Sequence, residues 1–532
     1  MKLFTSPNRG NMRRLLDEAK ENGVVLDTFL CTAVFGFFVH LFILATYIFN
    51  HDTLVLPYTN GDWLLTQGKW CVSWMTTYKG AFVLSYLGGA VGILAASGIA
   101  ATLCLIFSVQ NKSIGRLIGA ITVAFPSVST MLMYQAGDYF LLTALLATLA
   151  AFFFSRNDWL SAIIGVCLLT VSLGSYQAYV SSTAAILVIL CITELLQRET
   201  PWKQVLVSGL VYIGEILASI GFYYAILQYR LHITGTQLST YKGIDNMAGI
   251  LQPARLWAAI VGAVKNVYGF FLKDNLGLPS AGVRVIYTLV LLAILFLVIY
   301  IVYTRKLYTD VPRCALLVIL LVVCLPLAAN LIGVLSGNES YYYITSYSIT
   351  LIFTALPLLV EKCLLRGDKK GLTTSLLKGI SSCLIVLCIC GWFIRSNQGY
   401  QKLFFVNYNI QTKATALVAQ IQSVPGYTTE TQVVLAGKTP YLFLKSQGIG
   451  QSFETVNTLP MGILGSAASE IYSDGVLYYF IVNHISPNMV IVGEDHLTDA
   501  GKTVIKQMEI YPNSGSLQMV DDTLIVKLGE TE

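Results

Sequence analysis

The chain has 532 residues, of which 55% are hydrophobic and only 12% are charged. Soluble domains carry about twice that share of charged residues, so the composition excludes an ordinary water-soluble globular protein. The formal net charge of +5 is small for this length, and the cations lie in short loops rather than on one continuous face. Nucleic acid is therefore not an expected partner.

The first 27 residues are polar, and Met12 to Val24 has the pattern of an amphipathic helix on a membrane surface. The first apolar run that follows is already long enough to cross a bilayer, so a cleavable signal peptide is not expected. We interpret residues 1–27 as a cytoplasmic amphipathic segment.

Residues 28–395 contain about eleven apolar runs long enough to span a membrane. Inside lipid a backbone must satisfy its own hydrogen bonds, which favours helices. The predicted fold class is therefore an all-α polytopic membrane protein with about eleven transmembrane helices. The predicted spans are residues 28–49, 81–108, 117–133, 139–154, 159–175, 180–196, 205–227, 285–303, 315–335, 344–360 and 376–394.

The lysines and arginines of the short loops predict the orientation of the chain. They gather before the first span and in alternate loops after it, while the opposite short loops are almost bare of them. By the positive-inside rule the N-terminus is inside, and an odd number of spans places the C-terminus outside. The predicted location is the cytoplasmic membrane, with many passes.

Three segments on the predicted outer side are too long for simple turns, namely residues 50–80, 228–284 and 396–532. In the second, Pro253 to Lys273 is an apolar pattern interrupted by cations, which predicts a helix in the outer interface. These cations are suited to hold a phosphate or to extend toward lipid headgroups, and the pattern leaves both open. They are Arg255, Lys265 and Lys273.

The last segment, residues 396–532, has the pattern of a small α/β domain outside the membrane. A helical stretch near residues 408–423 is followed by short apolar runs separated by turn residues, which is typical of strands. The predicted strands are residues 431–436, 489–492 and 523–528.

The first outer segment carries the side chains best suited to chemistry. Asp52 follows the first span closely, and the motifs Gly61-Asp62-Trp63 and Gln67-Gly68-Lys69-Trp70 come after it. A carboxylate just beyond a membrane helix is well placed to take a proton from a water-borne hydroxyl. The alternative is that Asp52 and Asp62 are solvated loop acids, as most acids are.

Two further outer turns carry polar residues close to the bilayer. Asp138 lies in Tyr134-Gln-Ala-Gly-Asp138-Tyr-Phe, where it is either a functional acid or the N-cap of the fourth span. Tyr176 and Gln177 lie in Ser172-Leu-Gly-Ser-Tyr176-Gln177-Ala-Tyr179. These two residues suit stacking on a sugar and hydrogen bonding to it, or hydrogen bonds between helices.

These three motifs, in this order, resemble those of the GtrII-type membrane glucosyltransferases, and the resemblance covers roughly residues 25 to 400. Lys69 stands where the family usually has arginine, and His51-Asp52 where an acidic pair is common. The resemblance implies a bacterial glycosyltransferase with a GT-C-like membrane domain. It also implies a polyprenyl-phosphate-linked sugar, glucosyl by the family's name, as donor and a cell-envelope glycan as acceptor.

In that mechanism Asp52 acts as general base on the acceptor hydroxyl, with Asp62 and Asp138 as the other catalytic candidates. A single displacement inverts the anomeric carbon, and outer-face cations bind the lipid phosphate. The predicted substrate-binding residues are Trp63, Lys69, Trp70, Tyr176, Gln177, Arg255, Lys265 and Lys273.

No cofactor is predicted with a defined site. None of the five histidines stands at a metal-ligand spacing, so no metal centre is expected, although Asp52 with Asp62 offers oxygen ligands that suit a divalent cation. Two rival functions also need many spans or a large outer tail: a flippase for lipid-linked glycans, and a scaffold of the cell envelope without catalysis.

Overall fold

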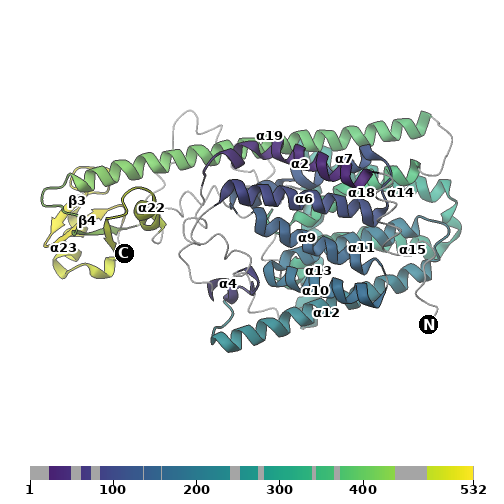
Figure 1. The fold of residues 1–532 in the computed structure, drawn as a ribbon, viewed down its shortest axis with the longest axis horizontal. Coiled ribbons are helices and arrows are strands. Elements are labelled where there is room, and N and C mark those ends of the chain that lie inside the picture. The colour runs from purple at the N-terminus through teal and green to yellow at the C-terminus, as the bar shows by residue number, and fades with distance from the viewer. Residues whose placement is uncertain are drawn as a thin grey trace. The chain divides into compact units, whose positions relative to one another are not determined.

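The computed structural model describes residues 23–48, 62–72, 84–135, 137–156, 158–239, 252–273, 281–337, 343–364, 372–437 and 476–530 (Figure 1). The chain divides into two compact units. The first comprises residues 1–45 and 60–397, and the second comprises residues 46–59 and 398–532.

In its described residues the first unit consists mainly of helices. Long apolar segments become helices in lipid because only intrasegment hydrogen bonds are available to the backbone there. Its helices are α2 (Val24–Ala45), α4 (Asp62–Thr66), α6 (Ser85–Phe107), α7 (Lys112–Ala124), α8 (Pro126–Met133), α9 (Gly137–Phe154), α10 (Trp159–Ser175), α11 (Val180–Leu195), α12 (Trp202–Thr234), α13 (Pro253–Leu272), α14 (Ala281–Thr304), α15 (Val311–Ile319), α16 (Leu325–Ala329), α17 (Leu331–Leu335), α18 (Thr350–Leu364) and the first part of α19 (Leu372–Gln422).

The helix lengths confirm a polytopic membrane protein. Within the described ranges, eight helices are long and apolar enough to cross a bilayer, and α7 with α8 makes nine if that bent pair counts as one span. Helix α10 is apolar but shorter, at 17 residues. The count of eleven spans stays a prediction.

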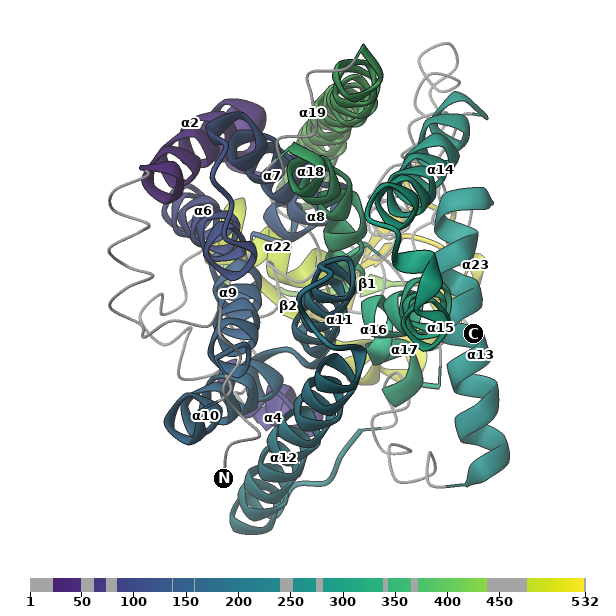
Figure 2. The same ribbon diagram turned by 90° about the vertical axis from the view of Figure 1, so that its right-hand side faces the viewer.

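Helices α2, α6, α9, α10 and α12 pack against one another in that order, as the view along the bundle shows (Figure 2). Small residues allow the close approaches. A Cβ on Gly36 of α2 would lie 2.7 Å from Val123 and 2.8 Å from Ile93, and one on Gly92 of α6 would lie 2.6 Å from the carbonyl oxygen of Gly137. Tight packing through glycine is the usual way in which membrane helices associate.

The third predicted span, residues 117–133, is not a single straight helix. Helices α7 and α8 meet at an angle of 41° at Phe125 and Pro126. Proline has no N–H to donate, so carbonyls of the preceding turn need other donors. The hydroxyl of Tyr347 donates to the Thr122 carbonyl at 3.2 Å, and Nε2 of His40 donates to that of Val123 at 2.9 Å. Side chains from other helices therefore donate hydrogen bonds to the carbonyls at the break.

Two arginines at one end of the bundle bind backbone carbonyls at the C-terminus of α11 and in the residues that follow it. Arg313 is 5% exposed and donates to the carbonyls of Leu195, Gln197 and Thr200 at 2.7 to 3.0 Å. Arg305 donates to the carbonyl of Leu196 at 2.7 Å. Arg305, just after α14, and Arg313, in the first turn of α15, therefore satisfy a helix end and complement its dipole, in addition to contributing charge.

Helix α13 runs across the bundle. In Figure 2 it is seen side-on, whereas α15 and α18 point toward the viewer. Ala259 and Ala263 pack against Val334 of α17, and the ring of Phe270 stacks on Tyr287 of α14 with centroids 5.4 Å apart. A helix with this direction fits the predicted interfacial segment, whose depth in a membrane stays a prediction.

The second unit contains a four-stranded sheet and the end of α19. Its elements are β1 (Gln432–Ala436), α22 (Val476–His484), β2 (Val490–Val492), α23 (Asp499–Gln507), β3 (Leu517–Val520) and β4 (Thr523–Lys527). The strand order is β2-β1-β4-β3, with β1 parallel to β2 and β4, and β3 antiparallel to β4. Strands β1, β2 and β4 coincide with the three apolar runs of the tail.

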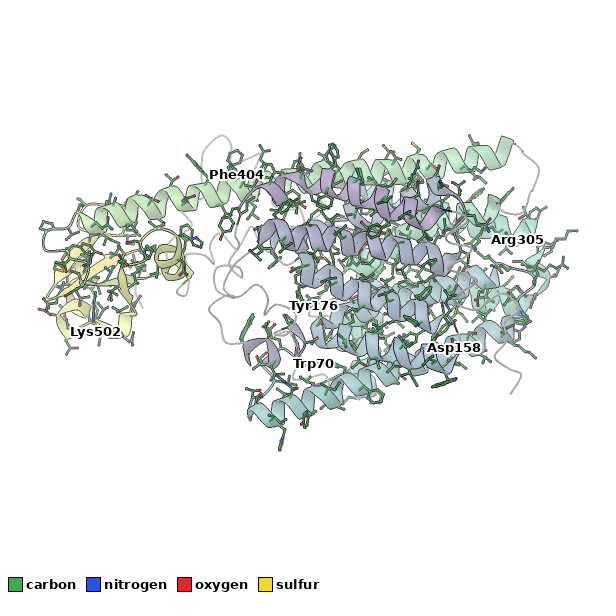
Figure 3. All side chains as sticks on the ribbon, in the orientation of Figure 1. Trp70, Asp158, Tyr176, Arg305, Phe404 and Lys502 are labelled. Atoms are coloured by element: carbon green, nitrogen blue, oxygen red, sulfur yellow. The ribbon has the colours of Figure 1, made fainter. Side chains whose placement is uncertain are left out.

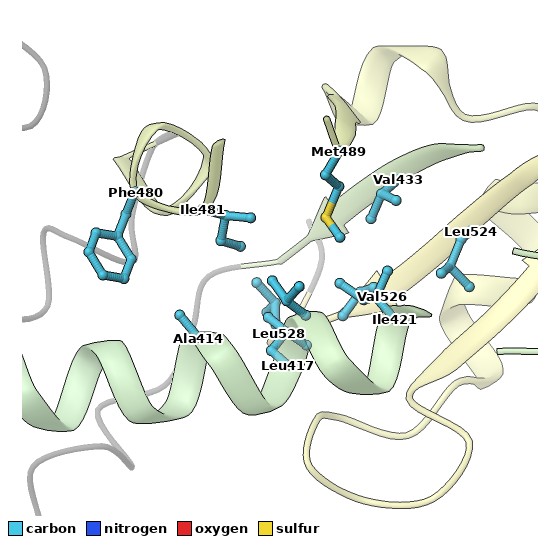
Figure 4. Packing of buried hydrophobic residues seen from close by; sticks show 11 residues of the cluster. Ala414, Leu417, Ile421, Val433, Phe480, Ile481, Met489, Leu524, Val526 and Leu528 are labelled. Atoms are coloured by element: carbon cyan, nitrogen blue, oxygen red, sulfur yellow. The ribbon is translucent and has the colours of Figure 1, made fainter. Parts of the chain in front are cut away.

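Helices cover both faces of this sheet. On one face α19 and α22 pack on Val433, Leu524 and Val526 (Figure 4). On the other face α23 packs on Val434 and Ile525. Parallel strands buried on both sides read as continuous apolar runs, which is why the tail shows no strict alternation.

Helix α19 differs from the expected pattern. Residues 376–394 and 408–423 are predicted as separate helices, but they belong to one helix of 51 residues. No proline occurs between Leu372 and Gln422, and the helix ends shortly before Pro425 and Gly426. Without a helix breaker, the change from apolar to amphipathic pattern does not interrupt the backbone.

Candidate active site

Segment 62–72 packs on one end of the helical unit. It consists of α4 and the turn that follows, and α4 contacts α12. The amide N–H of Cys71 donates to the Gly174 carbonyl at 2.8 Å, and that of Ser239 donates to the Thr66 carbonyl at 2.9 Å. The segment is thus fixed to the end of α10 and to the residues that follow α12.

Trp70 is the apolar anchor of this segment. Its indole ring is buried and covers Gly174, where any Cβ would overlap the ring. Trp63, on α4, is 44% exposed instead. Of the two tryptophans predicted to bind substrate, Trp70 therefore packs into the unit, and Trp63 presents its ring at the surface.

Gly68 makes a turn that only glycine adopts easily. Its φ is +72°, and a Cβ there would lie 2.5 Å from the Tyr223 hydroxyl and 2.8 Å from Nε2 of Gln177. That amide donates to the Gln67 carbonyl at 3.1 Å, and the tyrosine hydroxyl donates to the Gly68 carbonyl at 3.1 Å. The turn is therefore held through its backbone oxygens.

Lys69 follows this turn and lies over an aromatic ring. Its Nζ donates to Oε1 of Gln67 at 2.8 Å and lies 5.3 Å from the centroid of Tyr176. A cation at that distance from an aromatic face is attracted by the ring quadrupole. The lysine is half-buried, so its charge is held at a defined position at the edge of the unit.

Tyr176 belongs to a group of aromatic rings at the ends of α9 and α10. Its ring contacts those of Phe140 at 5.0 Å, Tyr179 at 5.4 Å and Tyr139 at 6.3 Å between centroids. The Tyr139 hydroxyl donates to the Ser175 carbonyl at 2.5 Å. This packing fixes the ring beneath Lys69, and Figure 3 shows Tyr176 and Trp70 at the same end of the unit.

Asp138 adjoins this group. It lies in the first turn of α9, next to Tyr139, and is 2% exposed. A carboxylate in the first turn is favoured by the partial positive charge of the helix N-terminus. Asp52 and the side chain of Asp62 lie outside the described residues.

The α13 cations come from another part of the unit. Arg255, Lys265 and Lys273 are exposed, and α13 packs on α14, α16 and α17, whereas segment 62–72 packs on α10 and α12. Figure 2 shows α4 between α10 and α12, with α13 at the right-hand side of the view, beyond α15 and α17. The described contacts therefore unite Lys69, Trp70, Tyr176 and Gln177, and they do not add the α13 cations to that group.

Two residues of this group were missed by sequence reasoning, namely Gly174 and Tyr223. Tyr223 belongs to a buried stripe of α12 with Tyr212, Ile216, Ser219 and Leu227. Spacings of three and four residues mark such a stripe, so its buried face was readable. The partner that the Tyr223 hydroxyl binds could not be predicted from this spacing.

No metal site is built from the described residues, where no group of three histidine, cysteine, aspartate or glutamate side chains is suited to hold an ion. The chemical character of the site is therefore a lysine, aromatic rings, amides and a nearby carboxylate. Such groups bind an anion and a sugar ring.

A family model described as Glucosyl transferase GtrII matches residues 41–354, which is more than half of the chain. The chain belongs to the GtrII glucosyl transferase family. It is a glycosyltransferase and a multi-pass membrane protein. The matched residues include α4, the turn at Gly68, the aromatic group around Tyr176 and all of α12. No curated protein and no solved structure matches the chain.

Proposed function

We propose that this GtrII protein transfers a glucosyl group from a polyprenyl phosphate to a glycan of the cell envelope. The observation that carries the proposal is the position of Lys69, whose ammonium is held 5.3 Å from the centroid of Tyr176 at one end of the membrane unit. A lipid phosphate is an anion at the membrane surface, and a sugar ring stacks on an aromatic face. Lys69 offers the cation, with the buried ring of Tyr176 beneath it, and the exposed ring of Trp63 on the same segment offers an aromatic face.

The reaction is a single displacement. The oxygen of an acceptor hydroxyl forms a bond to the anomeric carbon, and the bond from that carbon to the phosphate oxygen breaks. The hydroxyl proton passes to a carboxylate, and the lipid phosphate leaves with the bonding electron pair. Attack from the face opposite the phosphate inverts the configuration.

Asp52 is the proposed general base, and Asp62 and Asp138 are the other candidates. The position of Asp138 beside Tyr139, whose ring neighbours Tyr176, supports its inclusion. Lys69 stabilises the charge that grows on the leaving phosphate, because a fixed cation there needs no reorganisation during the reaction.

The site is proposed to face the outside of the cytoplasmic membrane. Arg305 and Trp70 lie at opposite ends of the first unit (Figure 3), and the short loops rich in lysine and arginine belong to the Arg305 end. The positive-inside rule assigns that end to the cytoplasm, which leaves Lys69 and Tyr176 outside. This orientation gives the N-terminus inside and the C-terminus outside.

The test is sugar transfer by the purified full-length protein in nanodiscs, with polyprenyl-phosphate-glucose as donor and isolated envelope glycan as acceptor. We expect Lys69→Met to lower transfer by about 10²- to 10³-fold, as loss of a transition-state charge contact does, and Lys69→Arg to keep most of it. Lys203→Met is the matched control, because Lys203 is an exposed lysine at the start of α12.

Three outcomes contradict the proposal. Full transfer by Lys69→Met removes the lysine from the mechanism. Turnover of a nucleotide sugar with no lipid carrier present removes the lipid-linked donor. Movement of the lipid-linked sugar across the bilayer without its transfer would favour the flippase instead.

A further inference from the structure

Tyr223 lies near the middle of a connected set of hydrogen bonds that joins α12 to the turn before Lys69. Nε2 of Gln177 donates one hydrogen to the Gln67 carbonyl at 3.1 Å and the other to the Tyr223 hydroxyl at 3.0 Å. That hydroxyl donates its own hydrogen to the Gly68 carbonyl at 3.1 Å. Every hydrogen of these two side-chain groups is thus directed at the turn or at the other group.

The geometry of the turn depends on this set. Gly68 has a left-handed φ of +72° and lies so close to Tyr223 and Gln177 that there is no room for a side chain. The residues on either side of Gly68 are also joined, because the Lys69 ammonium donates a hydrogen bond to Oε1 of Gln67 at 2.8 Å. A shift of the Gly68 peptide therefore moves Lys69 relative to Tyr176.

We propose that Tyr223 is a positioning residue for sugar transfer. Together with Gln177 it forms a latch that fixes the turn at Gly68, and this turn sets where the Lys69 ammonium lies. The proposal rests on the role given to Lys69 under Proposed function. Tyr223 acts through Lys69. In this proposal the Gln177 amide nitrogen holds the turn, whereas the sequence predicts that Gln177 binds a sugar.

The latch also links the site to helix packing. Tyr223 shares the buried stripe of α12 with Ser219, whose carbonyl accepts the hydroxyl of Thr170 of α10 at 3.3 Å. Gly174 of the same helix lies under Trp70. Residues 67–70 are therefore held by α12 near Gly68 and by α10 at Trp70. The position of Lys69 between them depends on how these two helices pack together.

Tyr223→Phe removes one hydroxyl and keeps the ring that fills the space. The Gly68 carbonyl then loses its donor, and the Gln177 amide loses one acceptor. We expect sugar transfer to fall by about 10- to 100-fold, since a shift of about 1 Å in a positioned group has effects of that size. Tyr224→Phe is the matched control, because it removes the hydroxyl of the next residue, which is exposed.

A double-mutant cycle distinguishes positioning from general damage. If Tyr223 acts through Lys69, the double variant Tyr223→Phe with Lys69→Met transfers sugar as fast as Lys69→Met alone. If the two losses multiply, Tyr223 supports the reaction by another route and the proposal is overturned. Membrane abundance and the thermal unfolding midpoint of each variant are measured alongside. We expect Tyr223→Phe to keep wild-type abundance and to lower the midpoint only slightly, because two neutral hydrogen bonds are lost.

A second measurement does not depend on activity. Amine acylation followed by mass spectrometry reports the reactivity of Lys69 in the full-length protein, with Lys203 as internal reference. We expect Tyr223→Phe to raise the reactivity of Lys69 and leave that of Lys203 unchanged, and an unchanged Lys69 overturns the latch. If the wild type transfers no sugar from the lipid donor, the proposed function fails, and this footprint still decides whether the latch exists.

Discussion

The indole ring of Trp70 lies directly over Gly174, which has no side chain to keep the ring away. The amide N–H of Cys71 donates to the carbonyl of the same glycine at 2.8 Å. Gly174 thus packs against the ring and accepts a backbone hydrogen bond from the segment that carries Lys69. This double contact explains how a short loop helix acquires a fixed position on the unit.

The first prediction tests this contact. Gly174→Ala places a methyl group where the ring lies, so Trp70 must move, and overpacking of this kind costs about 1 to 3 kcal/mol. We expect a lower unfolding midpoint and weaker sugar transfer. Gly214→Ala on α12 is the control, because a Cβ there meets nothing within 4 Å. Equal stability of the two variants would mean that Trp70 does not occupy this position.

The second prediction concerns the turn at Gly68. Gly68→Ala combines an unfavourable left-handed φ with overlap on Tyr223, and we expect a loss of about 1 to 3 kcal/mol in the free energy of unfolding. Gly235→Ala separates the two effects, because Gly235 also has a positive φ, +66°, but open space around it. Calorimetry should show the larger loss at Gly68, with transfer impaired only there.

The third prediction concerns the catalytic carboxylate. Asp52→Asn keeps the shape of the side chain but removes the proton acceptor, so we expect turnover to fall by about 10²- to 10⁴-fold, the range for a lost general base. Asp62→Asn and Asp138→Asn should cost less at equal membrane abundance. Near-normal transfer by Asp52→Asn beside an inactive Asp62→Asn or Asp138→Asn would assign the base to that other residue.

The fourth prediction concerns the end of α11. Arg313→Met leaves one buried and two partly buried carbonyls without their charged donor, and we expect a loss of about 2 to 4 kcal/mol in the free energy of unfolding. Arg198→Met removes an exposed arginine just beyond the same helix and should change stability by less than about 0.5 kcal/mol. Urea titration in detergent measures both.

The fifth prediction concerns orientation. A reporter that is active only in the cytoplasm, fused after Glu532, should give no signal, because the loop cations predict an outer C-terminus. The same reporter fused within the loop of Arg198 should be active. A signal from the Glu532 fusion would reverse the orientation and place Lys69 and Tyr176 on the cytoplasmic side.

The helical membrane class, the family and most span positions were predictable from local information. Each apolar run must form a helix in lipid whatever its neighbours are, so a segment such as residues 85–107 is readable by itself. The bend of 41° at Pro126, within the predicted span of residues 117–133, was not predicted. A proline permits such a bend, but donors from distant helices, His40 and Tyr347, decide whether its carbonyls are satisfied.

For the candidate site, too, part was predictable from the sequence and part depended on the tertiary structure. Residue types alone singled out Lys69, Tyr176 and Gln177, because a cation, a ring and an amide at the ends of apolar runs suit the binding of phosphate and sugar. Their contacts required the tertiary structure: Gln177 reaches the backbone of Gln67 across 110 residues of chain, and Tyr223 reaches Gly68 across 155. Hydropathy is a property of single segments, whereas which turn a hydroxyl of α12 meets depends on how the faces of α10 and α12 pack together.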